Sequence, residues 1–285
     1  MPLEVGTMRL RSLTVCLLLL VGTAAAAPAM DGPPEAAETR AHALLSQDPP
    51  DWTGARQAFR RAAEAGSATA MTHLGWIHEQ GHGVPRDGER AAHWYSRAAM
   101  AGADAFALKV AWMYLAGDGV DRDRERAEHW FGHAIDAQHT PAKTAWASVL
   151  ISDALGGRAP HRVFQAKGLL EEALDEGQIM AAYFLTRLYM EGIGDHPVDD
   201  QEAARYARIG ADHGHGQMQG WLAFMYQQGQ GVDADPVLAA KWANLAAAEG
   251  DPLGEQLRRR LDENLDDEDR AAARRLAVEW ALGRP

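Results

Sequence analysis

The residues of this chain that could most readily do chemistry stand at positions 78 to 82. His78 and His82 flank Glu79 in the spacing His-Glu-x-x-His. On an unbroken helix, two histidines at this spacing share one face and can hold zinc, while the glutamate serves as a general base. The string therefore raises the hypothesis of a metal-dependent enzyme using these three residues, such as a hydrolase of an envelope polymer (peptidoglycan or polysaccharide).

The surrounding sequence predicts that the helix breaks inside this motif. The phrase Gly-x-Gly-Val-x-x-Asp begins at Gly81 and returns at Gly117 and Gly229. A glycine in the left-handed conformation commonly ends a helix. We therefore expect a helix to end at Gly81 and His82 to lie in the turn, pointing away from His78. We interpret the motif as accidental, and we predict that the chain is not an enzyme and has no catalytic, metal-binding or cofactor-binding residues.

Other candidate sites are incomplete. His129 and His133 stand four residues apart, but no third ligand or carboxylate partner is evident near them. Asp118, Asp121 and Asp123 imitate part of a calcium loop without its terminal glutamate. The sequence also lacks a Gly-x-Ser-x-Gly elbow and a phosphate-binding glycine loop. The aspartate that recurs in each copy of the glycine phrase is better explained as a helix N-cap.

The N-terminal segment has the order of a secretory signal peptide. Two arginines precede an apolar run at 13–21, and small residues follow at 23–27. The run is shorter than the roughly 20 apolar residues that a membrane span needs. We therefore predict a cleavable signal peptide at 1–27, a flexible linker at 28–34, and a periplasmic or secreted mature protein without a stable membrane span.

Composition excludes further classes of protein. The only cysteine, Cys16, falls within the predicted signal peptide, so the mature chain would form no disulfide and offer no thiol for catalysis or metal binding. The formal net charge is −12, and it becomes −13 without residues 1–27, which carry two arginines and one glutamate. We expect no nucleic-acid partner, because phosphate binding depends on lysine and arginine.

The chain repeats with a period near 36 residues. Trp76 and Trp112 are 36 positions apart, as are Trp94 and Trp130. Each copy carries helical spacing of apolar residues on both sides of the glycine phrase, which predicts two helices per copy. A fixed period in this range is typical of a solenoid, in which no single unit can bury its own apolar face. The fold class we predict is all-α.

The predicted repeats are unequal. The unit at 139–177 is degenerate, since it loses the paired glycines and places Gly156, Gly157 and Pro160 in its turn. The predicted order is a degenerate first repeat at 35–66, five helix-pair repeats within 67–250 (67–102, 103–138, 139–177, 178–214 and 215–250), and C-terminal capping helices at 251–285.

One unit carries a recognisable consensus. It contains the pattern Ala-x-x-x-Leu-Gly, then Gly-x-Gly-Val-x-x-Asp, then Ala-x-x-Trp-Tyr-x-x-Ala-Ala-x-x-Gly between Ala70 and Gly102. This order resembles the Sel-one-like repeat family, a branch of the tetratricopeptide-like solenoids. The sequence departs from the family pattern at His78, where tyrosine is usual, at Ala111, and throughout the third unit. The resemblance implies an α-solenoid of antiparallel helix pairs wound as a right-handed superhelix, used as a scaffold or adaptor for other proteins.

In solenoids of this kind the first helix of each unit lines the concave side, so equivalent positions fall into rows along it. One row is Trp76, Trp112, Ser148, Arg187 and Phe224, and the adjacent row is His73, Lys109, Ala145, Phe184 and Trp221. Exposed aromatic residues with an interspersed arginine are typical of binding hot spots. We therefore predict partner contacts at every position of the two rows except Ser148 and Ala145. The alternative is that these rings pack between neighbouring units.

Together these patterns predict a non-enzymatic scaffold or adaptor of a bacterial-type cell envelope. Its concave groove would bind a peptide or protein segment, or a cell-envelope component, and its acidic surface would prefer basic or neutral partners. The alternatives are the metal-dependent hydrolase described above and a purely structural spacer that lacks a groove ligand.

Overall fold

The computed structural model describes residues 33–283, and over this range the chain forms fourteen α-helices, one short 3-10 helix and no strand. The bounds are α1 (Pro34–Leu45), α2 (Trp52–Glu64), α3 (Ala68–Gln80), α4 (Gly88–Met100), α5 (Ala105–Ala116), α6 (Arg124–Asp136), α7 (Pro141–Leu155), η1 (Pro160–Arg162), α8 (Val163–Asp175), α9 (Met180–Glu191), α10 (Asp200–Asp212), α11 (Gly216–Gln228), α12 (Pro236–Ala248), α13 (Pro252–Asn264) and α14 (Asp267–Leu282). The all-α class predicted from the sequence is confirmed.

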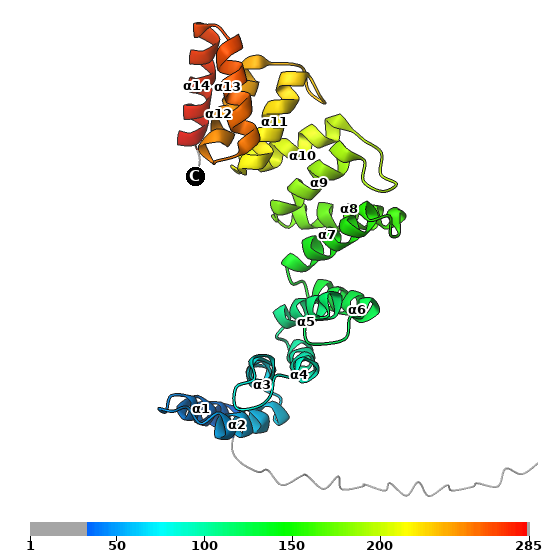
Figure 1. Cartoon of the computed structure of the whole chain (residues 1–285), viewed down its shortest axis with the longest axis vertical. Helices are drawn as coiled ribbons and strands as arrows, with labels where there is room; N and C mark the ends of the chain where they lie inside the picture. Colours follow the sequence, from blue (N-terminus) through cyan, green and yellow to red (C-terminus); the bar gives the residue numbers. More distant parts are fainter. Residues whose placement is uncertain (1–32, 284–285) are drawn as a thin grey trace, which may run out of the picture.

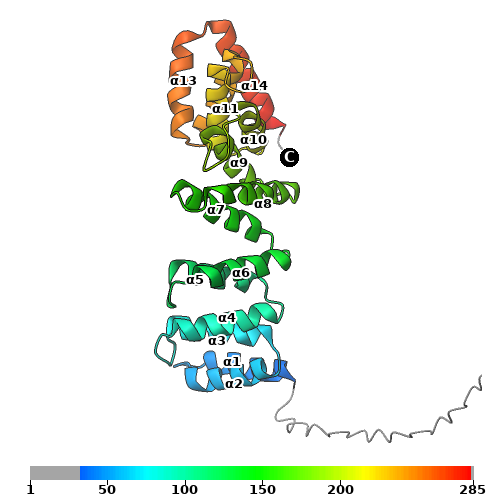
Figure 2. The same ribbon diagram turned by 90° about the vertical axis from the view of Figure 1, so that its right-hand side faces the viewer.

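The helices form pairs that stack in chain order. Figure 2 shows successive layers from α1 and α2 at one end to α13 and α14 at the other. In Figure 1 the stack is bowed, with α3, α5 and α7 toward the inner side of the bow and α4, α6 and α8 toward the outer side. This arrangement is the predicted α-solenoid, and it brings the first helices of neighbouring pairs onto one shared face.

Aspartates start the second helices, as the sequence predicts. The carboxylates of Asp87 and Asp123 accept hydrogen bonds from the backbone N–H three residues further on, at 2.8 and 3.0 Å. Asp199 and Asp235 do the same for α10 and α12. These bonds satisfy donors that the first turn of a helix leaves without partners. The recurring aspartate is therefore a capping residue.

Glycines end the first helices. The backbone of Gly81 adopts the left-handed conformation with φ of 79°, and its N–H donates to the carbonyl oxygen of Ile77. Gly117, Gly192 and Gly229 end α5, α9 and α11 in the same conformation. A residue with a Cβ is strained there, whereas glycine is not. The prediction that α3 ends inside the His-Glu-x-x-His string is confirmed.

The core consists of aromatic rings set among alanines. Tyr95 and Phe131 are fully buried, and alanines of the same helices flank them. Trp94 and Phe106 are only partly buried and pack against the core residues. Small residues on the facing surfaces let the helices approach closely while the rings fill the remaining volume.

Neighbouring pairs approach one another closely where a turn crosses the start of a helix. Gly88 begins α4, and Gly119 lies against it in the turn between α5 and α6. A Cβ on Gly88 would fall deep inside van der Waals contact with the carbonyl group of Gly119, which is backbone and cannot rotate away. The same geometry recurs between Gly231 and the carbonyl group of Asp200.

The third pair departs from this pattern. Its first helix, α7, has 15 residues, whereas α3, α5, α9 and α11 have 12 or 13. Asp153 stands 36 positions after Gly117, where the other units have the terminating glycine, and α7 continues through it to Leu155. Because no left-handed residue interrupts the chain at this point, the helix runs on and the turn is displaced to Gly156–Arg162.

The structure describes the C-terminal end of the chain but not most of its predicted N-terminal segments. The predicted signal peptide at 1–27, and all but the last two residues of the linker predicted at 28–34, lie outside the described residues. No helix within 33–283 combines the length and apolar character that crossing a membrane requires. At the other end, α13 and α14 pack against α12 and close the stack.

The contact at Gly88 yields a stability prediction. Gly88→Ala should lower the free energy of unfolding by about 1–3 kcal/mol, because the added methyl group must displace backbone. Gly132→Ala is the matched control, since Gly132 lies within α6 and a Cβ there would meet nothing within 4 Å. The control should stabilise by about 0.5–1 kcal/mol through helix propensity. Urea denaturation followed by circular dichroism measures both, and equal effects of the two variants would contradict the proposed contact.

Candidate functional site

The His-Glu-x-x-His string does not form a zinc site. The imidazole of His78 is buried at the end of α3, with 5% of its surface exposed. His82 lies in the following turn, where its ring stacks on Trp52 at 4.3 Å and contacts Trp76 at 4.5 Å between centroids. The helix that should align the two histidines ends between them. Within residues 33–283 no three His, Cys, Asp or Glu side chains are grouped so that they could hold a metal ion.

Glu79 joins three helices. Its carboxylate accepts hydrogen bonds from Tyr95 Oη of α4 at 2.7 Å and from Lys109 Nζ of α5 at 2.9 Å. Burial alone would raise the pKa of Glu79, but these two hydrogen bonds and the charges of Lys109 and Arg86 hold that pKa below its usual value. The pKa of the Tyr95 hydroxyl is raised by burial and by Glu79. The ionised carboxylate of Glu79 therefore links α3 to α4 and to α5. Each of its oxygens already accepts a hydrogen bond, so neither is free to act as a base.

The other histidines that we considered as ligands form no cluster with a third ligand within residues 33–283. Burial, followed by the charge of Arg90, lowers the pKa of His78, so its imidazole is neutral. His129 is exposed on α6, while His133 packs against Trp130 with centroids 5.4 Å apart. The Nδ1 atom of His213 lies 2.8 Å from the carbonyl oxygen of Ile209.

In the first predicted row, two residues are exposed and the other three are partly buried or ion-paired within the protein. Trp76 and Trp112 each expose 40% of their surface, at equivalent positions on α3 and α5. Ser148 is half-buried, and the guanidinium of Arg187 is paired with Glu191 at 2.8 Å. Phe224 is partly buried against the core. The exposed apolar surface of this row is therefore concentrated on the two tryptophans.

The second predicted row is largely engaged within the protein. The ring of His73 stacks on Phe59 at 4.5 Å, and Lys109 is paired with Glu79. Ala145 and Phe184 are partly buried against the core. Trp221 is half-buried and stacks on Tyr183, with centroids 5.2 Å apart. For these residues the structure favours the alternative interpretation, in which the rings pack between neighbouring units.

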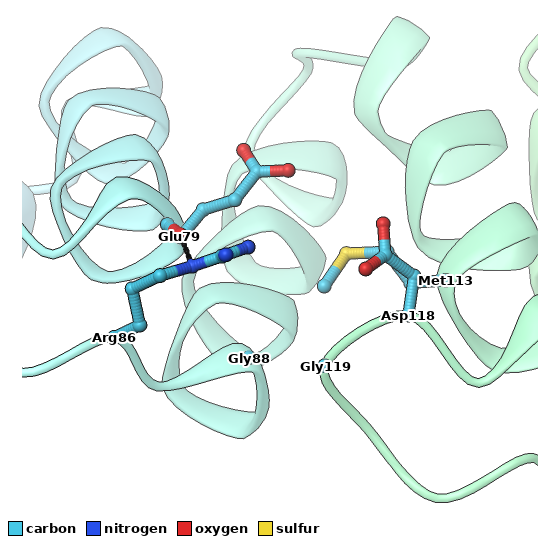
Figure 3. Close-up of a pocket in the computed structure, with 6 residues that line it drawn as sticks. All are labelled: Glu79, Arg86, Gly88, Met113, Asp118 and Gly119. Carbon is cyan, nitrogen blue, oxygen red and sulfur yellow. Dashed lines mark hydrogen bonds between the residues drawn. The ribbon is translucent and has the colours of Figure 1, made fainter.

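Two recesses flank Trp112. The first, which we call the α3–α5 recess, consists of two adjoining cavities of ≈ 440 and ≈ 490 Å³. Figure 3 shows part of it, with the guanidinium of Arg86 and the end of the Met113 side chain directed toward one another across the gap. The Nε atom of Arg86 donates to the carbonyl oxygen of Glu79 at 2.8 Å. The charged side chains that line it are Glu79, Asp118, Arg86 and Lys109, two acids and two bases.

The second, which we call the α5–α7 recess, lies on the other side of Trp112 and has a volume of ≈ 280 Å³. Its charged lining consists of Arg122, Arg124, Arg158 and Asp153. Asp153 is 5% exposed and is held by both Arg124 and Arg158. The distance from Arg158 Nη2 to Asp153 Oδ1 is 2.8 Å. Two guanidinium groups thus hold one carboxylate, and a third, that of Arg122, lines the same recess.

Sequence reasoning missed both the Glu79 network and the Asp153 cluster. The first joins residues that are 16 and 30 positions apart, a pairing that depends on the packing of three helices. The Asp153 cluster could have been suspected from the sequence, because a charged residue stands where the other repeats have a terminating glycine. That substitution both lengthens α7 and brings a carboxylate toward the preceding unit.

The Glu79 network yields a pH prediction. Glu79→Gln should lower the free energy of unfolding by about 1–2 kcal/mol at pH 7, because the variant loses its charge-assisted hydrogen bonds. The lowered pKa means that this stabilisation is present above the ordinary value of 4.5 and is lost as pH falls through the lowered pKa. Denaturation midpoints from pH 7 to pH 3 test this. Glu249→Gln, at an exposed side chain, is the control, and a difference for Glu79→Gln that does not change with pH would contradict the account.

Comparison with known proteins identifies the repeats. The Sel1 repeat model matches residues 68–102, 105–139, 179–215 and 217–251. These segments contain four helix pairs and omit α1–α2, the irregular pair α7–α8 and the terminal pair α13–α14. No curated protein matches the chain.

Solved structures share the fold. A Sel1 repeat protein from Oxalobacter formigenes superposes with a TM-score of 0.69 at 24% identity, over 88% of this chain and 73% of that one. A protective antigen of uropathogenic Escherichia coli strains, which displays an SLR fold, gives 0.62 at 24% identity over 87% of this chain. This chain spans about half of that antigen, 52% of its length. The four matched repeats and the shared architecture show that the chain belongs to the Sel1 repeat family.

Proposed function

We propose that this protein is a non-enzymatic scaffold of the bacterial-type cell envelope that binds a peptide or protein segment along its inner face. Sel1 repeat proteins generally serve as scaffolds for protein–protein interaction. The observation that carries the proposal is the pair of tryptophans at equivalent positions on α3 and α5, each 40% exposed. Trp112 lines recesses between α5 and the first helices on either side of it. Tryptophan is enriched in binding hot spots, and a folded protein has little structural reason to leave two of them exposed in a row.

The recesses beside Trp112 support the same proposal. They lie between neighbouring helix pairs, so side chains of a bound segment could enter them at intervals while its backbone follows the face. The edge-on contact of Trp112 with Phe131, with centroids 5.2 Å apart, fixes one side of the indole ring. A ring that is already positioned loses little side-chain entropy when a partner binds.

The envelope location rests on the sequence alone. The order of basic, apolar and small residues at 1–27 supports export, and the absence of cysteine from the rest of the chain is compatible with either an oxidising or a reducing compartment. A fusion of residues 1–40 to a reporter enzyme that is active only after export tests this part of the proposal separately from binding.

The binding face is tested with a library of random peptides displayed against the purified protein. Peptides selected in this way should bind Trp76→Ala and Trp112→Ala at least about 30-fold more weakly, since truncated hot-spot aromatics cost about 2 kcal/mol or more. Phe164→Ala is the control, because Phe164 is 51% exposed but lies on α8. Unchanged affinity in both tryptophan variants, or a larger loss in the control, would contradict the proposed face.

The competing enzyme hypothesis makes a different prediction. The helix end at Gly81 and the engaged carboxylate of Glu79 both oppose a zinc hydrolase. We expect purified protein to retain less than stoichiometric zinc by elemental analysis, with no difference between the natural chain and His78→Ala. Stoichiometric zinc that disappears in His78→Ala would instead support the enzyme.

A further inference from the structure

The α5–α7 recess is positively charged although the chain as a whole is acidic. The chain as a whole carries a formal net charge of −12, yet this recess sets three arginines against one aspartate, a surplus of two positive charges. The α3–α5 recess, on the other side of Trp112, balances two acids against two bases. The two sides of the same tryptophan therefore differ in electrostatic character.

The recess contains more arginines than are needed to neutralise the buried carboxylate of Asp153. One guanidinium would neutralise buried Asp153, but Arg124 and Arg158 both contact it. Arg122 does not contact Asp153, and its Nε atom donates to the carbonyl oxygen of Leu115 at 2.8 Å. No described residue accepts a hydrogen bond or forms an ion pair with the terminal nitrogens of Arg122, and its side chain is exposed. Guanidinium nitrogens held in this way are positioned to bind a carboxylate through paired hydrogen bonds.

The irregular third unit creates this recess. Asp153 replaces the glycine that ends the first helix in the other units, so α7 runs on and carries the carboxylate to Arg124 at the start of α6. The displaced turn supplies Arg158, and exposed Ser152, the residue before Asp153, also lines the recess. In the third unit, the position of the usual helix end is therefore surrounded by hydrogen-bond donors, which lie beside Trp112.

We infer that the α5–α7 recess binds the carboxylate side chains of an acidic segment of a partner protein, next to an apolar contact on Trp112. This inference rests on the proposed function and specifies the chemistry of its partner. It also reverses the expectation of basic or neutral partners drawn from net charge. At physiological ionic strength charges are screened beyond about 8 Å, so a carboxylate inside the recess responds to the arginines around it more than to the acidic surface elsewhere.

Two matched peptides test the inference by fluorescence anisotropy. The first is fluorescein-labelled Gly-Ser-Glu-Glu-Phe-Glu-Glu-Ser-Gly, and the second has glutamine in place of every glutamate. The acidic peptide should bind the full protein about 10-fold more tightly in low salt, and the ratio should fall as salt is added. Arg122→Gln and Arg158→Gln should each reduce the ratio to about 3-fold or less and leave the affinity for the glutamine peptide unchanged.

Arg86→Gln is the matched control. Arg86 occupies the position equivalent to Arg122 in the preceding unit and makes the same hydrogen bond to a helix-end carbonyl, at 2.8 Å. It lines the balanced recess instead, so its removal should leave the ratio unchanged. Because Arg122 does not hold Asp153, Arg122→Gln keeps the proposal testable if Arg158→Gln perturbs folding, which circular dichroism will reveal.

Several results would overturn the inference. Equal binding of the two peptides, with both weakened by Trp112→Ala, would reject the acidic partner and leave the proposed function intact. Loss of the ratio in Arg86→Gln as well would show that the preference does not come from this recess. No binding of either peptide at about 1 mM would overturn the inference alone, since the peptide library decides the proposed function. Self-association that Arg158→Gln abolishes, measured by light scattering, would assign the recess to a second copy of the chain.

Discussion

The close approach of neighbouring helix pairs is the constraint on which the rest of the structure depends. No pair can bury its own apolar face, so each must be covered by the next. At Gly88 and Gly119 the backbones come so near that a side chain on Gly88 has no room between them. The alanines of the second helices serve the same end, while rings such as Tyr95 and Phe131 fill the space that remains. Capping aspartates and left-handed glycines then fix where each helix begins and ends.

This constraint explains why residues that look catalytic take structural roles. Glu79 is at the end of α3, next to both α4 and α5, and it is bound by one side chain from each. His82 packs in the turn against two tryptophans, and His78 is buried at the end of α3. The face that we propose for a partner is the inner one, where the first helices lie side by side, and Trp76 and Trp112 are exposed on two of these helices. The chemistry available there is contact and charge, which is what a scaffold requires.

The repeat pattern made most of the fold predictable. The glycine phrase, the aspartates and the 36-residue period are local features with local causes, so the helix ends and the solenoid follow from them. The site was less predictable. Equivalent positions identify which residues share a face, but not which of them are already engaged, and Lys109, Arg187 and Phe184 proved to have partners within the protein. The Asp153 cluster depends on how far α7 extends and on where the displaced turn of the third unit falls, neither of which a period describes.

The central claim is that a partner segment lies on the inner face at Trp76 and Trp112. The chain has nine tryptophans, and the indole N–H signals of 15N-labelled protein, assigned by substitution, report on each during titration with a selected peptide. The account predicts that the signals of Trp76 and Trp112 shift together and saturate, while those of the buried Trp130 and Trp242 stay in place. Shifts confined to tryptophans away from the inner face, or none at saturating peptide, would contradict it.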